Sequence, residues 1–394
     1  MRASDAVEVE GPANALTISS EDVELAHVEL ANEIDKRAER VVEHALEKMA
    51  PNIVESLYAA LPQQLKEQRA VQEGFEERLY QRWKGGLDRL EMLIIMAHES
   101  GETYLADLQR EFVGQSQSDE SVLLDVLVSL HCRACRTARE ILSLLRAGYA
   151  DGANARWRSL HELAVTALFL AQHRGDAPER YRAHAAVQRW RAATPYQEHC
   201  HTLGYEPFSP EEMAEMKEAA DNATAKYGVE LKKNYGWAAE AICKPQPNFA
   251  EIEASLDLSA WRPFFGLASQ GVHADARALF FSLGLPEDAE TRLLAGASDA
   301  GLADPGHCTA ISLTLTSVAL LTAKPNLDAL IACKCMLSVC EDVGTEFLRS
   351  HQIQRSHPSS PSTAWASLAT RVKRAALITL THAQSSGGRA LKTV

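Results

Sequence analysis

The segment 156–162, with the sequence RWRSLHE, carries the side chains most capable of chemistry. On an ideal helix with about 100° per residue, Arg158 and Glu162 are about 40° apart and His161 lies close to both. Arg156 and His161 are about 140° apart. One helix face therefore presents an arginine, a histidine and a carboxylate together. An anion-holding arginine beside a group that moves protons is a suitable set for phosphodiester chemistry.

The same side chains also allow a purely structural interpretation. An Arg158–Glu162 ion pair would lock two helices together, with His161 hydrogen-bonded nearby. Ser269 and His273 are spaced i to i+4 and so share a helix face. If their helix packs against the one carrying Arg158, these side chains form one polar cluster, which costs stability unless every member is satisfied. Spacing leaves open whether the cluster is catalytic or structural.

Helices must position these side chains, and the helical pattern extends along almost the whole chain. Residues 120–147 place apolar side chains at spacings of three and four, which makes one continuous stripe. Gly148 is a typical residue for a helix end, and the next helix carries segment 156–162. Because the link is so short, we expect the two helices to pack antiparallel. The stripe consists of Leu123, Leu127, Leu130, Ala134, Ala138, Ile141 and Leu145.

We therefore predict an all-α protein: a helical bundle with an acidic N-terminal helical arm and a C-terminal helical extension. Pro51 and Pro62 are predicted to interrupt the N-terminal helices, and Gly85–Gly86 to kink the helix over 75–98. The expected regions are a loose tail (1–18), an N-terminal helical region (19–115), a central bundle with the site (120–285), C-terminal helices (306–355) and a basic terminal helix (366–384).

The charge is acidic overall and uneven along the chain. A net charge of -13 argues against coating a nucleic acid or an anionic membrane over a large surface. Residues 131–191, however, carry 11 basic side chains against 5 acidic ones, and all 11 are arginine. Guanidinium binds carboxylate or phosphate through a planar fork, so RNA or a nucleotide is a candidate partner. The alternative is that these arginines pair with the chain's own acidic residues.

The termini have opposite charges. Residues 1–60 hold 13 acidic and 5 basic side chains, whereas the chain after Trp365 holds five basic side chains and no acidic one. The acidic arm or the basic helix could bind a partner protein, and the two could also pair with each other. A homo-oligomer is expected.

Cysteine usage and the remaining motifs predict a protein that binds no cofactor and no metal. Cys132 and Cys135 form a Cys-x-x-Cys, but inside a helical run, which favours buried free thiols over zinc. Cys333, Cys335 and Cys340 are likewise expected in the core. Phosphate-binding glycine loops and the common protease and hydrolase signatures are absent.

Localisation follows from the N-terminus and from the longest uncharged stretch. The first residues lack a secretory signal, which predicts a cytoplasmic protein with reduced thiols. The uncharged stretch 305–323 contains six Ser or Thr and is therefore predicted as a buried helix with no membrane crossing.

Three segments carry a resemblance to a known family. Residues 148–162 (GYADGANARWRSLHE), 235–237 (YGW) and 269–274 (SQGVHA) resemble an uncharacterised family of bacterial helical proteins, over roughly residues 75–285. The resemblance implies a mostly helical fold and no established activity.

A more distant similarity is to the HEPN superfamily of helical ribonucleases and nucleotide-binding proteins. Their signature is an arginine, four to six residues and a histidine, and Arg156 to His161 fits with four between. This similarity implies metal-independent RNA cleavage, usually across a homodimer.

The leading hypothesis is thus an RNA-cleaving or RNA-binding effector of a bacterial defence or toxin system, and if an enzyme, a metal-independent endoribonuclease. The alternatives are a non-enzymatic scaffold or regulator with a structural cluster, and a sensor of a nucleotide-like anion. In the leading hypothesis Arg156 and Arg158 hold phosphate, His161 is the acid/base, Glu162 orients it, and Ser269 and His273 complete the site.

Overall fold

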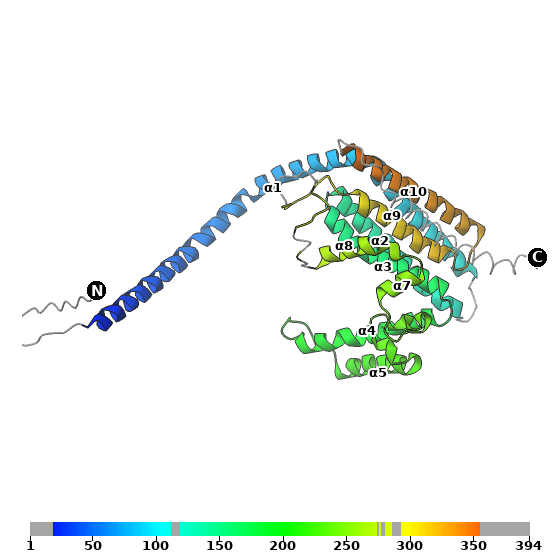
Figure 1. The fold of residues 1–394 in the computed structure, drawn as a ribbon, viewed down its shortest axis with the longest axis horizontal. Coiled ribbons are helices and arrows are strands. Elements are labelled where there is room, and N and C mark those ends of the chain that lie inside the picture. The colour runs from blue at the N-terminus through cyan, green and yellow to red at the C-terminus, as the bar shows by residue number, and fades with distance from the viewer. Residues whose placement is uncertain (1–18, 112–118, 274–275, 277–279, 286–292, 355–394) are drawn as a thin grey trace, which may run out of the picture. The chain divides into compact units, whose positions relative to one another are not determined.

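The computed structural model describes residues 19–111, 119–273, 276, 280–285 and 293–354 (Figure 1). Helices make up its regular structure, and no described residue lies in a strand, which confirms the all-α class. The expected tail (1–18) and basic terminal helix (366–384) lie outside the described residues. The α-helices are α1 (Ser20–Glu111), α2 (Asp119–Arg146), α3 (Ala150–Gln172), α4 (Ala177–His199), α5 (Pro210–Tyr227), α6 (Ala239–Ile242), α7 (Phe249–Ser255), α8 (Arg262–Val272), α9 (Ala303–Leu321) and α10 (Leu327–Gln354).

Helix α1 is continuous over 92 residues, so the predicted interruptions at Pro51 and Pro62 were wrong. An interior proline removes one backbone donor at a cost of about 3 kcal/mol, and the Ala, Leu, Glu and Lys residues that dominate this segment favour the helix strongly enough to offset it. At the start, the Ser19 hydroxyl accepts a hydrogen bond from the N–H of Asp22 at 3.1 Å, as expected of a helix cap.

Residues 1–74 and 75–394 form two compact units. The described part of the first unit is the N-terminal half of α1. Its large apolar side chains are exposed to water, which is unusual for a helix of this length. They are Val23, Leu25, Val28, Leu30, Ile34, Val41, Val42, Leu46, Met49, Ile53, Val54, Leu57, Tyr58, Leu61, Leu65 and Val71.

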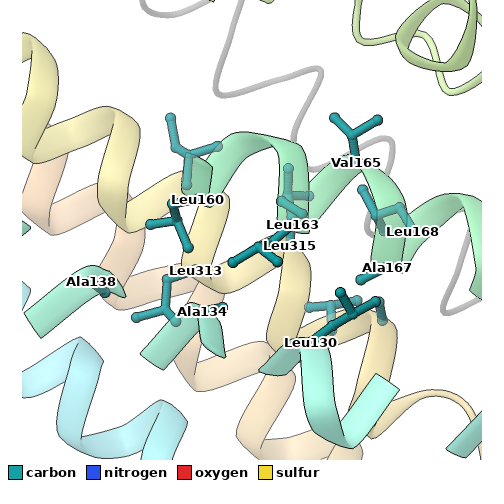
Figure 2. Close-up of a cluster of buried hydrophobic side chains, with 14 of the residues drawn as sticks. Leu130, Ala134, Ala138, Leu160, Leu163, Val165, Ala167, Leu168, Leu313 and Leu315 are labelled. Atoms are coloured by element: carbon teal, nitrogen blue, oxygen red, sulfur yellow. The ribbon is translucent and has the colours of Figure 1, made fainter. Parts of the chain in front are cut away.

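The core of the second unit is formed by α2, α3, α9 and α10 together with the part of α1 that follows residue 75 (Figure 1). All seven residues of the predicted stripe on α2 are buried, as are the apolar side chains of α3 that face them (Figure 2). Arg156 contacts Glu140, and Gly152 lies beside Leu144, so α2 and α3 are antiparallel as predicted.

Helix α9 lies in the middle of this core, and every residue from Pro305 to Leu321 is buried. Its hydroxyl groups are satisfied within the helix: Thr314 and Thr316, for example, each donate to the carbonyl four residues earlier at 2.8 Å. The prediction of a buried helix is confirmed. None of the helices in the described ranges is both long enough and apolar enough to cross a membrane.

Gly85 and Gly86 serve helix packing. A Cβ atom on Gly86 would lie 2.7 Å from the ring of Phe347 on α10, so only glycine permits this approach. Two cysteine predictions also need correction, because Cys132 and Cys335 are exposed. Cys333 and Cys335 are about 200° apart on α10, so only one of them can face the core.

Candidate functional site

Helix α3 presents segment 156–162 to two different neighbours. Helix α8 runs antiparallel along one side of α3, with Phe265 beside Arg158 and His161, and Gly271 beside Ala155. Helix α2 lies on another side. Which neighbour a side chain of α3 faces therefore decides its environment.

His161 is buried in an aromatic cage, with only 1% of its surface exposed. Its Nε2 lies 2.8 Å from Oε1 of Glu253, a fully buried carboxylate on α7. The second oxygen of Glu253 accepts a hydrogen bond from Arg262 of α8 at 2.7 Å. These residues form a chain from the core to the surface, named below the His161–Glu253–Arg262 chain. Rings around His161 belong to Trp157, Phe249, Trp261 and Phe265.

Arg158 and Glu162 form the predicted ion pair, with Nη2 of Arg158 3.1 Å from Oε1 of Glu162. The two side chains are 29% and 34% exposed. The guanidinium groups of Arg158 and Arg262 lie 4.9 Å and 5.0 Å from the centre of the Phe265 ring, which holds both cations in place. Arg158, Glu162, Arg262 and Phe265 are named below the α3–α8 face.

The α3–α8 face has a free donor and a carboxyl group with an altered pKa. The Nε of Arg158 is buried and has no hydrogen-bond partner among the described residues. Burial raises the pKa of Glu162, and the nearby carboxylate of Glu253 adds to the rise, whereas Arg158 opposes it. Burial also raises the pKa of Tyr235, with further contributions from Glu162 and Glu253. Glu162 is thus closer to protonation near neutral pH than an ordinary glutamate.

Arg156 faces away from this site, toward α2. Its Nε lies 2.5 Å from Oε2 of Glu140, and its Nη2 donates to the hydroxyl of Thr137 at 3.3 Å. The structure therefore separates Arg156 from His161, in agreement with their expected angle of about 140°.

Ser269 and His273 lie on α8 and at its end. The Ser269 hydroxyl donates to the carbonyl of Phe265 in its own helix at 2.8 Å. His273 is exposed, and its backbone N–H donates to the Ser269 carbonyl at the helix end. The structure brings the helix of Ser269 to α3 as expected, but the hydroxyl is already hydrogen-bonded.

The sequence interpretation missed Glu253 and Arg262. Glu251 and Glu253 lie two residues apart in α7, and only Glu253 is buried. The Asn248–Glu251 capping box marks the start of α7 and could have revealed this helix. It does not reveal which glutamate faces α3. In the described ranges, no three His, Cys, Asp or Glu side chains converge so that they could hold a metal ion.

The fold and the site together define an all-α protein with a polar cluster between two packed helices of its core. Residues 124–290 match the model of DUF5677, a family of unknown function. This match confirms the resemblance to an uncharacterised family, and it covers most of α2 and all of α3 to α8, including every residue of the cluster. No curated protein and no solved structure matches the chain significantly.

Proposed function

We propose that this protein is a HEPN-like, RNA-binding and RNA-cleaving effector of a cytoplasmic bacterial defence or toxin system, with the α3–α8 face as its site. One observation carries the proposal. A carboxylate and two guanidinium groups lie together and are each about one-third exposed: 34% for Glu162, 29% for Arg158 and 41% for Arg262. Cations that bind phosphate beside a proton-transferring carboxyl are what phosphodiester cleavage requires.

The roles differ from those expected from sequence. Arg158 and Arg262 bind the phosphate through the exposed parts of their guanidinium groups. Glu162, with its raised pKa, is the acid–base group. His161 is too deeply buried to contact RNA, so it acts as a positioning residue that fixes Arg262 through Glu253.

The arginine-only region supports this proposal in part. Arg136, Arg146, Arg156 and Arg180 pair with the chain's own acidic residues. Arg133 is exposed and has no ion-pair partner in the described part of the chain. It lies within electrostatic reach of Glu162, whose pKa it lowers. One uncompensated cation therefore flanks the α3–α8 face.

The test compares two isosteric substitutions on opposite sides of α3. Glu162→Gln removes the proposed acid–base group. Glu140→Gln is the matched control, because Glu140 pairs with Arg156 at a similar exposure of 36%. Purified wild type and both variants are incubated with single-stranded RNA, and melting temperatures are recorded in parallel. Glu162→Gln should slow cleavage at least about 100-fold with Glu140→Gln near wild type. Equal rates in all three proteins would refute the assignment.

A second candidate function is a non-enzymatic scaffold or regulator in which the cluster is structural. The observation that favours it is the burial of His161 and Glu253, which are 1% and 0% exposed. It predicts that wild type leaves RNA intact and binds none, and that Arg158→Ala and Glu162→Ala lower the melting temperature by several degrees.

The HEPN-like proposal also requires a second copy of the chain, and the exposed apolar side chains of α1 offer the surface for it. They form a ridge at steps of four, over Ile34, Ala38, Val42 and Leu46 and again over Met49, Ile53, Leu57 and Leu61. Apolar side chains that repeat at more than 3.6 residues drift around a straight helix. They stay against one partner only if the two helices wind around each other right-handedly. Two copies of α1 that pack ridge against ridge with this winding bury both ridges.

Light scattering on the full chain tests whether a second copy of the chain binds through this ridge. Ile53→Glu, on the ridge, should convert a dimer or larger oligomer to a monomer. Val54→Glu is the matched control, since Val54 is similarly exposed but lies about 100° away from the ridge position. A monomeric wild type, or an oligomer that survives Ile53→Glu, would refute assembly through this ridge.

A further inference from the structure

A cavity of about 620 Å³ lies between α1 and α2. Residues 98–105 of α1 and 128–143 of α2 form its walls, and Leu320 of α9 contributes to it. Its size falls in the range of pockets that hold small organic molecules. None of the residues of the α3–α8 face lines it.

Its inner wall is uncharged. Val128, Leu105 and Leu320 are apolar, and His131 is 97% buried with its Nε2 3.1 Å from the Ser317 hydroxyl. Burial lowers the pKa of His131 to about 4, so the ring is neutral at pH 7. Burial also raises the pKa of the neighbouring Cys135 thiol to about 12, which keeps it protonated.

The rim carries two arginines and two glutamates, and one of the arginines has no carboxylate partner within the described ranges. Glu140 lies 3.2 Å from Arg136 and 2.5 Å from Arg156, so two cations share one carboxylate. Glu102 lies 3.5 Å from His98. Arg139 has no ion-pair partner among the described residues, although its side chain lines the cavity. The guanidinium of Arg139 is thus the rim cation that no carboxylate of the described residues neutralises.

We propose that this cavity binds a small organic anion, with an apolar body against the inner wall and a single carboxylate, sulfonate or phosphate head on Arg139. The apolar side chains favour the first feature, and the unpaired guanidinium of Arg139 favours the second. The site is independent of the RNA-cleavage proposal, because none of the residues that line the cavity belongs to the α3–α8 face.

The probe is 8-anilinonaphthalene-1-sulfonate, titrated into the full chain by calorimetry. N-phenyl-1-naphthylamine has the same aromatic body without the charge and serves as the neutral comparison. We expect saturable binding of one sulfonate per chain. Arg139→Gln should weaken it about tenfold, which corresponds to one charge-assisted hydrogen bond.

Two further variants separate the cavity from the rest of the surface. Arg133→Gln is the matched control: Arg133 is an exposed arginine of the same helix that does not line the cavity, and its removal should leave binding unchanged. Cys132→Trp places a bulky side chain at the cavity wall from an exposed position and should abolish binding, as should Ser143→Trp from the other end.

Three results would overturn the proposal. The first is a lack of saturable sulfonate binding by wild type. The second is binding that persists in both folded tryptophan variants, which would place the sulfonate elsewhere. The third is equal affinity for the sulfonate and the neutral amine, or an equal loss in Arg139→Gln and Arg133→Gln, which would remove Arg139 as the anion-binding group.

Discussion

The substitution Glu253→Ala tests the central structural feature of the site, the His161–Glu253–Arg262 chain. The carboxylate of Glu253 is fully buried and makes contacts of 2.8 Å to His161 and 2.7 Å to Arg262. Its removal leaves the imidazole without its partner inside an aromatic cage. Breaking a buried charged pair from one side costs about 3–5 kcal/mol.

The lower end of this range is expected here, because Arg262 is 41% exposed and regains water when Glu253 is lost. A loss of about 3 kcal/mol corresponds to a fall of about 6–12 °C in melting temperature for a domain of 150–250 residues, and to a smaller fall as the cooperative unit grows. Glu253→Gln preserves the shape and one acceptor oxygen, so its cost should be clearly smaller.

Thermal unfolding followed by circular dichroism at pH 7 measures the effect. Glu240→Ala is the control, since Glu240 also pairs with an arginine, Arg180, but its side chain is 62% exposed. Such surface pairs contribute at most about 1 kcal/mol. If Glu253→Ala melts within 2 °C of Glu240→Ala, the buried chain does not stabilise the fold in the way argued above.

Four other predictions concern single residues. Gly236→Ala should destabilise the fold severely, because its Cβ would lie 1.8 Å from the carbonyl oxygen of Glu230. Gly266→Ala on α8, where no heavy atom lies within 4 Å, should raise the free energy of unfolding by about 0.5–1 kcal/mol. The pKa of His131 is lowered to about 4, so the unfolded chain binds its proton first and stability should fall as pH drops from about 6.5 to 4. His131→Gln should flatten that part of a pH series of urea unfolding curves. Burial raises the pKa of Asp304 to about 6, which has the opposite sign, so Asp304→Asn should raise the melting temperature at pH 7 and have little effect at pH 4.

Features that depend on residues close together in the sequence could be predicted. The α2 stripe repeats every three or four residues, and all its members are buried. The angle between Arg156 and His161 follows from helix geometry alone, and their separation follows from that angle. The Arg158–Glu162 contact could be predicted from the i to i+4 spacing, because no stronger ion-pair partner among the described residues competes for either side chain.

Features that depend on distant residues could not be predicted from local patterns. Gly85 and Gly86 indicate a kink when read locally, but Phe347, far along the chain, explains Gly86. Glu253 reaches His161 across 92 positions of the sequence. Between Glu251 and Glu253, only the packing of α7 against α3 decides which carboxylate is buried. The glycine of the Tyr235-Gly236-Trp237 motif is likewise explained by packing, because the backbone of Glu230 approaches it closely. The residue types of the motif do not reveal this contact.

Comparison of Arg156 and Arg158 shows how a lock and a candidate site differ on one helix. Both arginines lie on α3, both pair with a glutamate, and their side chains are similarly exposed at 33% and 29%. Arg156 uses its Nε on Glu140 and a second nitrogen on Thr137, so its hydrogen-bonding capacity joins α3 to α2. Arg158 keeps a buried Nε without a partner in the described structure, next to a carboxyl whose pKa is raised. Leaving such a donor unsatisfied costs about 1–3 kcal/mol. A protein that only needed to fix α3 would gain stability by satisfying Arg158 as it satisfies Arg156, and this asymmetry is the reason for our proposal that the functional side of α3 is the side toward α8.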